Sequence, residues 1–539
     1  MVRQPAALPY AMAAVPVLLL SLALYVPTLL PDVGTWDTAE FQAIGPVLGI
    51  AHPTGYPTYT LLAWLASVVL QPVGNEAYRA DLLSALLMAA TAALGAVACL
   101  QLTGRWALGL VAGTAFAVAP IAWRVATRAD AHALHVAFAG LLLVLLIEWR
   151  RRERPARHEQ DERRARAGRW LLVAAVIYGL SLGNHALTLL LAPGIGLYVL
   201  LVRPGILWRR RRLVLGCLAV LVLTAAVVYA YLPIRSSMDP PLDYASPRTP
   251  EAFWYVVLGE QFQGSFGPLP APDVLISGIW DVLVANLGIL VVLVPAGALL
   301  GATRHGREIV LTGAWFVATW LFAIGYPNAS IERYYLVPLL VACVWIALAA
   351  DVAWDALRAL VWPPARPAEP SRAPSPHQAP SPAVLRSPAA ATLLGTLLVA
   401  GLVVLAVAPV PGRYDRADAS DETFGRDWLE AALDALAPRA AVVSWWSYST
   451  PLWYGRWVEG RREDIVIIDD RDVIDDGFGS AENAIDHHLG ERPVYVIRLE
   501  RDLPALARRY VLQLVPEVPS PGELYRVVAR RPDPSPEAA

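Results

Sequence analysis

Residues 170–202, WLLVAAVIYGLSLGNHALTLLLAPGIGLYVLLV, decide the fold class of this chain. The stretch holds 33 residues without a formal charge, between an arginine-rich segment at 150–169 and a second one at 203–212. A helix needs about 20 apolar residues to cross a bilayer, so the stretch is too long for one crossing. Because arginine-rich loops stay on the cytoplasmic side, an even number of crossings must separate the two segments. We therefore predict two short helices that turn near Gly183, Asn184 and His185.

Further apolar runs extend this pattern along the chain. They cover residues 11–30, 82–102, 106–123, 131–147, 213–234, 282–300, 309–326, 334–350 and 389–408. With 56% hydrophobic residues and a mean hydropathy of +0.46, the composition excludes an ordinary soluble domain. The sequence thus predicts a polytopic α-helical membrane protein with about 11 transmembrane helices. The arginine clusters place the N-terminus in the cytoplasm and everything after about residue 410 outside.

The chain is predicted to divide into four parts. Residues 1–352 form the transmembrane region, which includes a first outer loop at 31–81. Residues 353–386, rich in Pro, Arg, Ala and Ser, form a cytoplasmic linker, and residues 387–409 form the last transmembrane helix. Residues 410–539 form a small extracytoplasmic α/β domain. Its elements are expected as a helix at 424–436, strands at 440–444, 465–468 and 494–497, and a hairpin from 510–514 and 524–528.

The first outer loop contains an apolar stretch, residues 41–70, that a hydropathy window would count as another span. Its centre reads HPTGYP at residues 52–57, and two prolines and a glycine interrupt a helix. We expect one or two short helices that lie along the membrane surface instead.

Asp37 and Glu40 precede this stretch, and their spacing of three residues would place them on one face of a helix. The same spacing is typical of a capping box at a helix N-terminus, and spacing alone leaves that interpretation open. Their position at the membrane surface favours carboxyl groups with perturbed pKa values. A proline-broken segment at membrane depth favours a cavity lining. Asp37 and Glu40 are therefore the candidate catalytic residues.

Few arginines are predicted on the outer side. Arg128, Arg235 and Arg333 follow predicted outer helix ends, where each alone can anchor to lipid head groups. Together with Asp37 they suit a phosphate-bearing lipid, because a guanidinium binds phosphate through two N–H groups. Three histidines, His132, His135 and His185, also lie near outer helix ends, a position typical of polar interfacial residues. No carboxylate completes a metal-ligand set with them, so no metal is expected, although the paired carboxylates do not exclude a divalent cation.

The segment DTAE at residues 37–40, followed by LGIAHPTGYPTY at 48–59, resembles the opening signature of the protein O-mannosyltransferase-like membrane family of the GT-C glycosyltransferase superfamily. Family members read roughly Gly-Asp-Ser-Gly-Glu, and then Leu-Gly-Ile-Ala-His-Pro-Pro-Gly-Tyr-Pro. The similarity extends through residues 179–185, 231–235 and 239–244. This sequence departs from the pattern at Trp36, which replaces a glycine, and at Thr54, which replaces a proline.

This resemblance implies a GT-C-like enzyme that takes a sugar, mannose by analogy, from a polyprenyl-phosphate carrier on the outer face. The acceptor would be a hydroxyl of a protein, a glycan or a lipid. Asp37 matches the usual base, and Glu40 the second acidic position. The leaving phosphate is assigned to Arg235 first, and to Arg333 or Arg128 second. The expected substrate-binding residues are His52, Tyr56, Asp130, His185, Arg235, Arg128 and Arg333.

The expected location is the inner (plasma) membrane of a bacterium, because all 44 cationic residues are arginine, a usage that suggests a GC-rich genome. The expected partners are membrane lipid, the lipid-linked sugar and the acceptor, with no cofactor and no nucleic acid. Two other function classes stay open. A lipid or sugar transporter would carry buried charges at the bilayer centre and internal repeats. A non-catalytic scaffold with an outer binding domain would not need Asp37.

Overall fold

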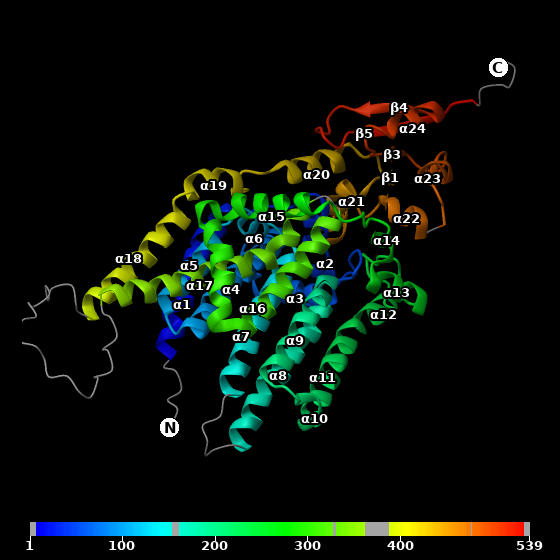
Figure 1. Ribbon diagram of the computed structural model, residues 1–539. Helices are drawn as coiled ribbons and strands as arrows, with labels where there is room; N and C mark the ends of the chain where they lie inside the picture. Colours follow the sequence, from blue (N-terminus) through cyan, green and yellow to red (C-terminus); the bar gives the residue numbers. More distant parts are fainter. Residues whose placement is uncertain (1–6, 154–160, 327–329, 362–387, 476, 533–539) are drawn as a thin grey trace, which may run out of the picture.

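The computed structural model describes residues 7–153, 161–326, 330–361, 388–475 and 477–532. It consists of a large helical region with a small α/β domain at one end (Figure 1). The longer helices are α1 (Ala7–Tyr25), α4 (Glu76–Thr103), α5 (Trp106–Ala117), α7 (Ala131–Glu153), α8 (Asp161–Leu182), α9 (Ala192–Val202), α11 (Arg211–Tyr229), α15 (Pro272–Leu287), α16 (Leu293–Gly325), α17 (Leu336–Val361) and α18 (Pro388–Val407). The shorter ones are α2 (Trp36–Val47), α3 (Pro57–Val69), α6 (Pro120–Ala126), α10 (Ile206–Arg209), α12 (Tyr231–Ser236), α13 (Pro250–Leu258), α14 (Glu260–Gln263) and α19 (Val410–Ala417).

Within the described residues, seven segments are long and apolar enough to cross a membrane, and the bent pair α5 and α6 would be an eighth. Three shorter apolar helices lie at Pro57–Val69, Ala167–Leu182 and Ala186–Val202. The fold class of a polytopic helical membrane protein is therefore confirmed, while the count of 11 crossings stays a prediction.

The predicted turn in residues 170–202 is present. Helix α8 ends at Leu182, and a 3-10 segment, η2 (Ala186–Leu191), leads into α9. The predicted run at 282–300 covers the end of α15, the 3-10 segment η3 (Gly288–Val292) and the start of α16, and the run at 309–326 covers the end of α16. Helix α16 kinks between them at His305, where φ is −128°. Close packing fixes these helices: a Cβ on Gly297 of α16 would lie 1.8 Å from the Trp345 carbonyl oxygen of α17. Only glycine allows that approach.

Part of the predicted linker at 353–386 is helical. Helix α17 continues to Val361, so the first residues of the segment predicted as a linker are helical. Residues 362–387 lie outside the described residues.

Residues 41–70 form two short helices, α2 and α3, as the sequence predicts, because the HPTGYP segment at 52–57 separates them.

The C-terminal domain is α/β, as predicted. Its strands are β1 (Ala441–Val443), β2 (Val466–Ile468), β3 (Val494–Val496), β4 (Tyr510–Val515) and β5 (Leu524–Arg530), and its helices are α20 (Phe424–Ala435), α21 (Trp446–Trp453), α22 (Asp470–Asp475), α23 (Ala481–His488) and α24 (Leu503–Arg509). The sheet order is β2-β1-β3-β5-β4. Strands β2, β1 and β3 are parallel, and β4 and β5 form the predicted antiparallel hairpin. Helices α21 and α22 follow the carboxyl ends of β1 and β2, the edge where parallel sheets usually bind ligands.

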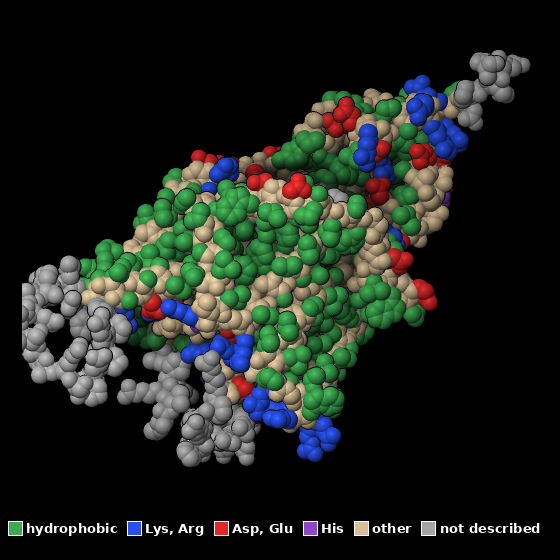
Figure 2. Space-filling view, viewed as in Figure 1, with side chains coloured by type: hydrophobic (Ala, Val, Ile, Leu, Met, Phe, Trp, Pro, Cys, Tyr) green, Lys and Arg blue, Asp and Glu red, His purple; other side chains and the backbone are tan. Residues whose placement is uncertain are grey.

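The space-filling view shows how charge is distributed on one face of the molecule. Figure 2 shows a broad hydrophobic surface over the helical region, with arginines at the end that holds α10 and mixed charges on the α/β domain at the other end. The α/β domain also contacts the first loop closely, since a Cβ on Gly425 of α20 would lie 2.2 Å from the Val33 carbonyl oxygen. This contact places the domain over the start of α2.

Candidate active site

Asp37 lies in the first turn of α2, between groups from two distant parts of the chain. Its Oδ2 accepts a hydrogen bond from Arg333 Nη2 at 2.6 Å, and its Oδ1 accepts one from Trp446 Nε1 at 3.0 Å. Arg333 belongs to the 3-10 segment η4 (Ile331–Tyr335) before α17, and Trp446 begins α21 of the α/β domain. Neither oxygen is used to cap α2, and the N-cap residue Thr35 makes no side-chain capping bond. The capping-box interpretation is therefore wrong for Asp37.

Glu40 lies one turn further along α2 and is 2% exposed. Its Oε1 accepts a hydrogen bond from the His52 backbone N–H at 2.8 Å, and its Oε2 lies 2.5 Å from His52 Nδ1. The other ring nitrogen of His52, Nε2, lies 3.2 Å from the Tyr56 hydroxyl oxygen. Glu40 does not line the cavity described below, whereas His52 and Tyr56 do. The two oxygens of Glu40 therefore hold His52 in place.

Backbone conformation adds to this arrangement. Trp36, Leu48 and Tyr56 all have φ between 46° and 57°, a region that side chains other than glycine rarely occupy. Each such residue costs on the order of 1–3 kcal/mol and persists only where its surroundings fix it. These three residues bracket α2 and precede α3, so the strained positions frame the segment that carries Asp37, Glu40 and His52.

The charges of these groups depend on one another. Burial raises the pKa of Asp37, but the positive charges of His52 and Arg333 outweigh it, so the pKa of Asp37 lies below its ordinary value. For Glu40, burial outweighs His52, and the pKa lies above its ordinary value. Burial lowers the pKa of His52, yet Glu40 outweighs burial and holds that pKa above its ordinary value. Asp37 is thus ionised at neutral pH, while Glu40 and His52 share a proton between them.

Arg333 also joins Asp37 to a second acidic residue. Arg333 Nη1 donates to Asp130 Oδ2 at 3.3 Å. The other oxygen of Asp130, Oδ1, accepts the His132 backbone N–H at 2.7 Å and lies 2.9 Å from His132 Nδ1. Burial raises the pKa of Asp130, but Arg333 and His132 outweigh it and hold that pKa far below its ordinary value. Asp130 is therefore ionised, and Arg333 lies between two carboxylates.

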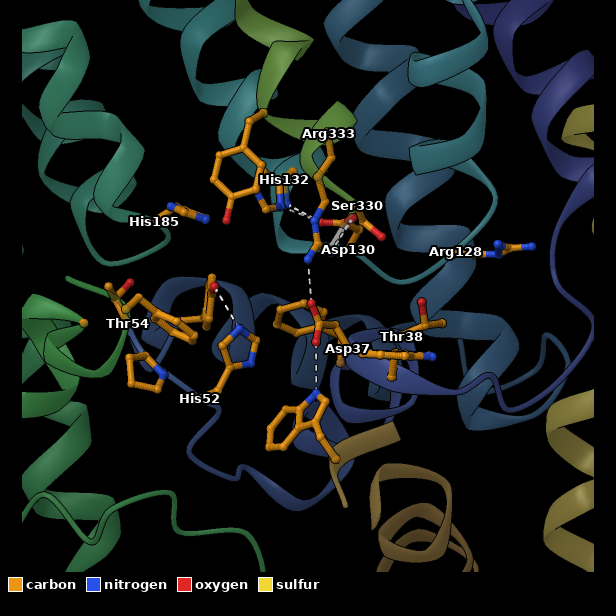
Figure 3. A pocket seen from close by; sticks show the side chains of 18 of the residues that line it. Asp37, Thr38, His52, Thr54, Arg128, Asp130, His132, His185, Ser330 and Arg333 are labelled. Carbon is orange, nitrogen blue, oxygen red and sulfur yellow. Dashed lines mark hydrogen bonds and ion pairs between the residues drawn. The ribbon is translucent and has the colours of Figure 1, made fainter. Parts of the chain in front are cut away.

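These residues surround a cavity of about 900 Å³ between the helical region and the α/β domain. Figure 3 shows Asp37, Thr38 and His52 on one side of it, facing Arg333, His132 and His185 on the other. Part of the remaining wall is aromatic: Phe266, Phe322 and Tyr326 lie with ring centroids between 5.1 and 5.6 Å apart. The cavity thus joins a charged centre to an apolar wall.

The other predicted residues divide into two groups. His185 and Arg128 line the cavity, as do Asp130, His52, Tyr56 and Arg333. Arg128 Nη2 binds Glu422 at 2.5 Å near the start of the α/β domain. Arg235, to which the sequence analysis first assigned the leaving phosphate, is not among the described residues that line the cavity. Its Nε and Nη2 donate to the carbonyl oxygens of Leu48 and Val47 at 2.8 and 3.0 Å, so it satisfies the C-terminal end of α2.

The α/β domain supplies residues that sequence reasoning did not assign. Trp446 contacts Asp37, and its ring lies 5.5 Å from that of His52. Arg471 donates to the Tyr255 hydroxyl at 3.0 Å and lies over the rings of Tyr255 and Tyr244. The only sequence signal was the Trp pair at 445–446 after a predicted strand. Among the described residues, no three His, Cys, Asp or Glu side chains are arranged to hold a metal ion.

Comparison with known proteins shows which family part of the chain resembles. Residues 37–205 match the family described as the Protein O-mannosyl-transferase TMEM260 N-terminal domain. The resemblance to O-mannosyltransferase-like proteins is therefore confirmed for this part of the chain. The mouse protein named Protein O-mannosyl-transferase TMEM260 is 33% identical over 210 residues, which make up 38% of this chain. The match spans 27% of the length of that relative.

Solved structures show the same fold over nearly the whole chain. ArnT from Cupriavidus metallidurans bound to undecaprenyl phosphate has a TM-score of 0.58 at 15% identity, with 97% of each chain covered. The Archaeoglobus fulgidus oligosaccharyltransferase in the apo form has a TM-score of 0.55 at 13% identity, with 95% of this chain and 73% of that chain covered. At such identities the similarity establishes the fold, and these neighbours and the apolar helices describe a multi-pass membrane protein.

Proposed function

We propose that this protein is a membrane glycosyltransferase that moves a sugar, mannose or a similar hexose, from a polyprenyl-phosphate carrier to an acceptor hydroxyl. One observation carries the proposal: Asp37, ionised and held by Arg333 and Trp446, lies in a cavity that also has an aromatic wall. A charged lipid-linked sugar needs both features. The fold shared with structures that contain undecaprenyl phosphate or dolichol phosphate supports this donor class.

In the proposed reaction, Asp37 is the base. The acceptor oxygen forms a bond to the anomeric carbon while the bond from that carbon to the phosphate oxygen breaks, and Asp37 takes the acceptor's proton. The bonding electron pair leaves with polyprenyl phosphate. A single displacement inverts the anomeric carbon. Because Asp37 is ionised at neutral pH, it also stabilises the positive charge that develops on the sugar.

Arg333 is the proposed partner of the leaving phosphate. Its guanidinium already binds Asp37 and Asp130, so a phosphate entering the cavity competes with these carboxylates for it. Withdrawal of Arg333 towards the phosphate frees Asp37 to accept a proton. Arg128, which binds the more exposed Glu422, is placed to meet the phosphate at the cavity edge. His52, fixed by Glu40, is placed to orient the acceptor beside Asp37.

The polyprenyl chain and the acceptor would enter from different sides. The aromatic wall formed by Phe266, Phe322 and Tyr326 suits the lipid chain, and the α/β domain with Trp446 and Arg471 suits the acceptor. We place the cavity on the outer face of a bacterial plasma membrane, with the N-terminus in the cytoplasm. The arginine segments at 150–169 and 203–212 support this orientation.

A donor panel tests the proposal. Purified protein in liposomes receives polyprenyl phosphates linked to different sugars, with a cell extract as acceptor source, and mass spectrometry follows donor loss and free polyprenyl phosphate. We expect one donor to be consumed with release of an equal amount of polyprenyl phosphate. If no donor is consumed by protein that is folded and correctly inserted, the transferase proposal fails. Transbilayer movement of an intact donor would favour a transporter instead.

A further inference from the structure

Three buried imidazole nitrogens near the cavity have no hydrogen-bond partner among the described residues: Nε2 of His132, of His135 and of His185. Buried polar atoms are nearly always paired, so each unpaired one requires an explanation. His132 and His185 line the cavity, whereas His135 does not. The rings of His132 and His185 lie 4.6 Å apart between centroids, and Tyr334 packs against both of them.

The partners of the Nδ1 atoms determine what each Nε2 can do. Nδ1 of His185 accepts a hydrogen bond from the Leu187 backbone N–H at 3.1 Å, so the ring proton of His185 must reside on Nε2. Burial, followed by the charges of His132 and His135, lowers the pKa of His185 well below its ordinary value, which keeps the ring neutral. His185 therefore presents a fixed N–H donor.

His132 presents the opposite group. Its Nδ1 faces the ionised Asp130 at 2.9 Å, and a carboxylate only accepts hydrogen bonds, so the ring proton of His132 resides on Nδ1. Nε2 of the neutral ring then carries a lone pair. One histidine thus offers a donor and its neighbour an acceptor at the same wall of the cavity.

A hydroxyl group is the ligand that matches such a pair, because it accepts one hydrogen bond and donates another. Phosphate, which mainly accepts, would leave the lone pair of His132 unmatched. Two hydrogen bonds of about 2.8 Å to one oxygen place the two nitrogens about 4.6 Å apart, a distance that suits neighbouring rings. A water molecule can occupy the position in the free protein, and a ligand hydroxyl would reproduce its bonds.

We propose that His132 and His185 together bind one hydroxyl of the sugar being transferred and so select the donor sugar. The inference rests on the proposed function, since it takes the cavity to hold a lipid-linked sugar. Asp130 connects His132 to Arg333. In Figure 3, His132 and His185 lie on the same side of the cavity as Arg333. A phosphate held by Arg333 therefore puts the attached sugar beside the two imidazoles.

The experiment compares the consumed donor with analogues that lack one sugar hydroxyl each. For the wild type we expect one analogue to lose on the order of 100-fold in kcat/KM, tenfold for each lost bond. In His132→Phe or His185→Phe, the parent donor should lose about tenfold, so that its ratio to the analogue falls from about 100 to about 10, and in the double variant the ratio should approach one. His185→Gln, which keeps an N–H donor, should retain part of the ratio. His135→Phe changes the same cluster away from the cavity and should keep the wild-type ratio.

Two results would overturn the inference. In the first, removal of no single sugar hydroxyl lowers kcat/KM of the wild type. In the second, the Phe variants lower kcat/KM of the parent donor and of the analogue equally. Quenching of tryptophan fluorescence gives the binding ratio of parent and analogue without turnover. If binding discriminates the hydroxyl through the two histidines but no sugar is transferred, the proposed function fails and the recognition site stands. If transfer occurs with unchanged ratios in both Phe variants, the recognition site fails and the function stands.

Discussion

The hydrogen bond from Trp446 to Asp37 predicts that the α/β domain tunes the proposed base. Replacing Trp446 by Phe removes the indole N–H, which lies 3.0 Å from Asp37 Oδ1, and keeps an aromatic ring near His52 and Trp453. A hydrogen bond to a charged group contributes about 1.5–3 kcal/mol. Asp37 is 23% exposed, and we reduce this to about 1–2 kcal/mol for solvent screening. That is roughly a factor of 5–30 in the protonation equilibrium of Asp37.

The sign of the effect follows from which form the bond favours. Trp446 stabilises the ionised carboxylate, so its loss raises the pKa of Asp37, and the acidic limb of the pH profile of kcat/KM should move to higher pH. Activity at neutral pH should change little. The matched control is Trp445→Phe, because Trp445 packs on Trp36 and is not bonded to Asp37 in the described structure. An acidic limb that stays in place, or that moves equally in both variants, would refute the reasoning.

Three further changes test other contacts. Arg333→Gln leaves Asp37 and Asp130 without their cation, at a cost of about 3–5 kcal/mol. Burial then raises both carboxyl pKa values, so the two groups are more often protonated at pH 5, and the drop in thermal midpoint should be larger at pH 8 than at pH 5. An equal drop at both pH values would contradict this. Glu40→Gln should lower kcat/KM, measured from initial rates, roughly 10- to 100-fold because His52 is held less firmly. Donor binding, measured by fluorescence titration, should persist. An unchanged rate would argue against the positioning of His52 by Glu40. Arg235→Met should lower the thermal midpoint in detergent and leave the KM for the donor unchanged, because the described hydrogen bonds from Arg235 to the backbone end on the carbonyls of Val47 and Leu48 at the end of α2. A raised KM would assign Arg235 to the phosphate site again.

Much of the fold could be predicted from local patterns. The turn at 183–185 followed from the length of an apolar run and the arginines around it, and the strands at 441–443, 466–468 and 494–496 followed from short buried runs. Helices α2 and α3 followed from the prolines and glycine between them. The kink of α16 at His305 falls in the gap between the predicted apolar runs at 282–300 and 309–326.

The site could be predicted only in part, since it depends on contacts between distant residues. Asp37 and His52 were found because they lie in one short motif. The partners of Asp37, however, come from positions 333 and 446, and no local pattern indicates that an indole from the α/β domain would reach α2. Arg235 was assigned to phosphate by its residue type, whereas the structure uses it to bind carbonyls at the end of α2. His132 was noted for its position near an outer helix end, but its proposed role depends on Asp130.

The central claim is that Asp37 is the base of glycosyl transfer, and single-turnover transfer by Asp37→Asn in liposomes tests it most directly. The control is Asp239→Asn, an exposed carboxylate after α12 whose described ion pair is with Arg248. We predict that Asp37→Asn binds the donor as the wild type does but transfers its sugar about 10²- to 10⁴-fold more slowly, while Asp239→Asn transfers at the wild-type rate. Transfer by Asp37→Asn at the wild-type rate would contradict the account.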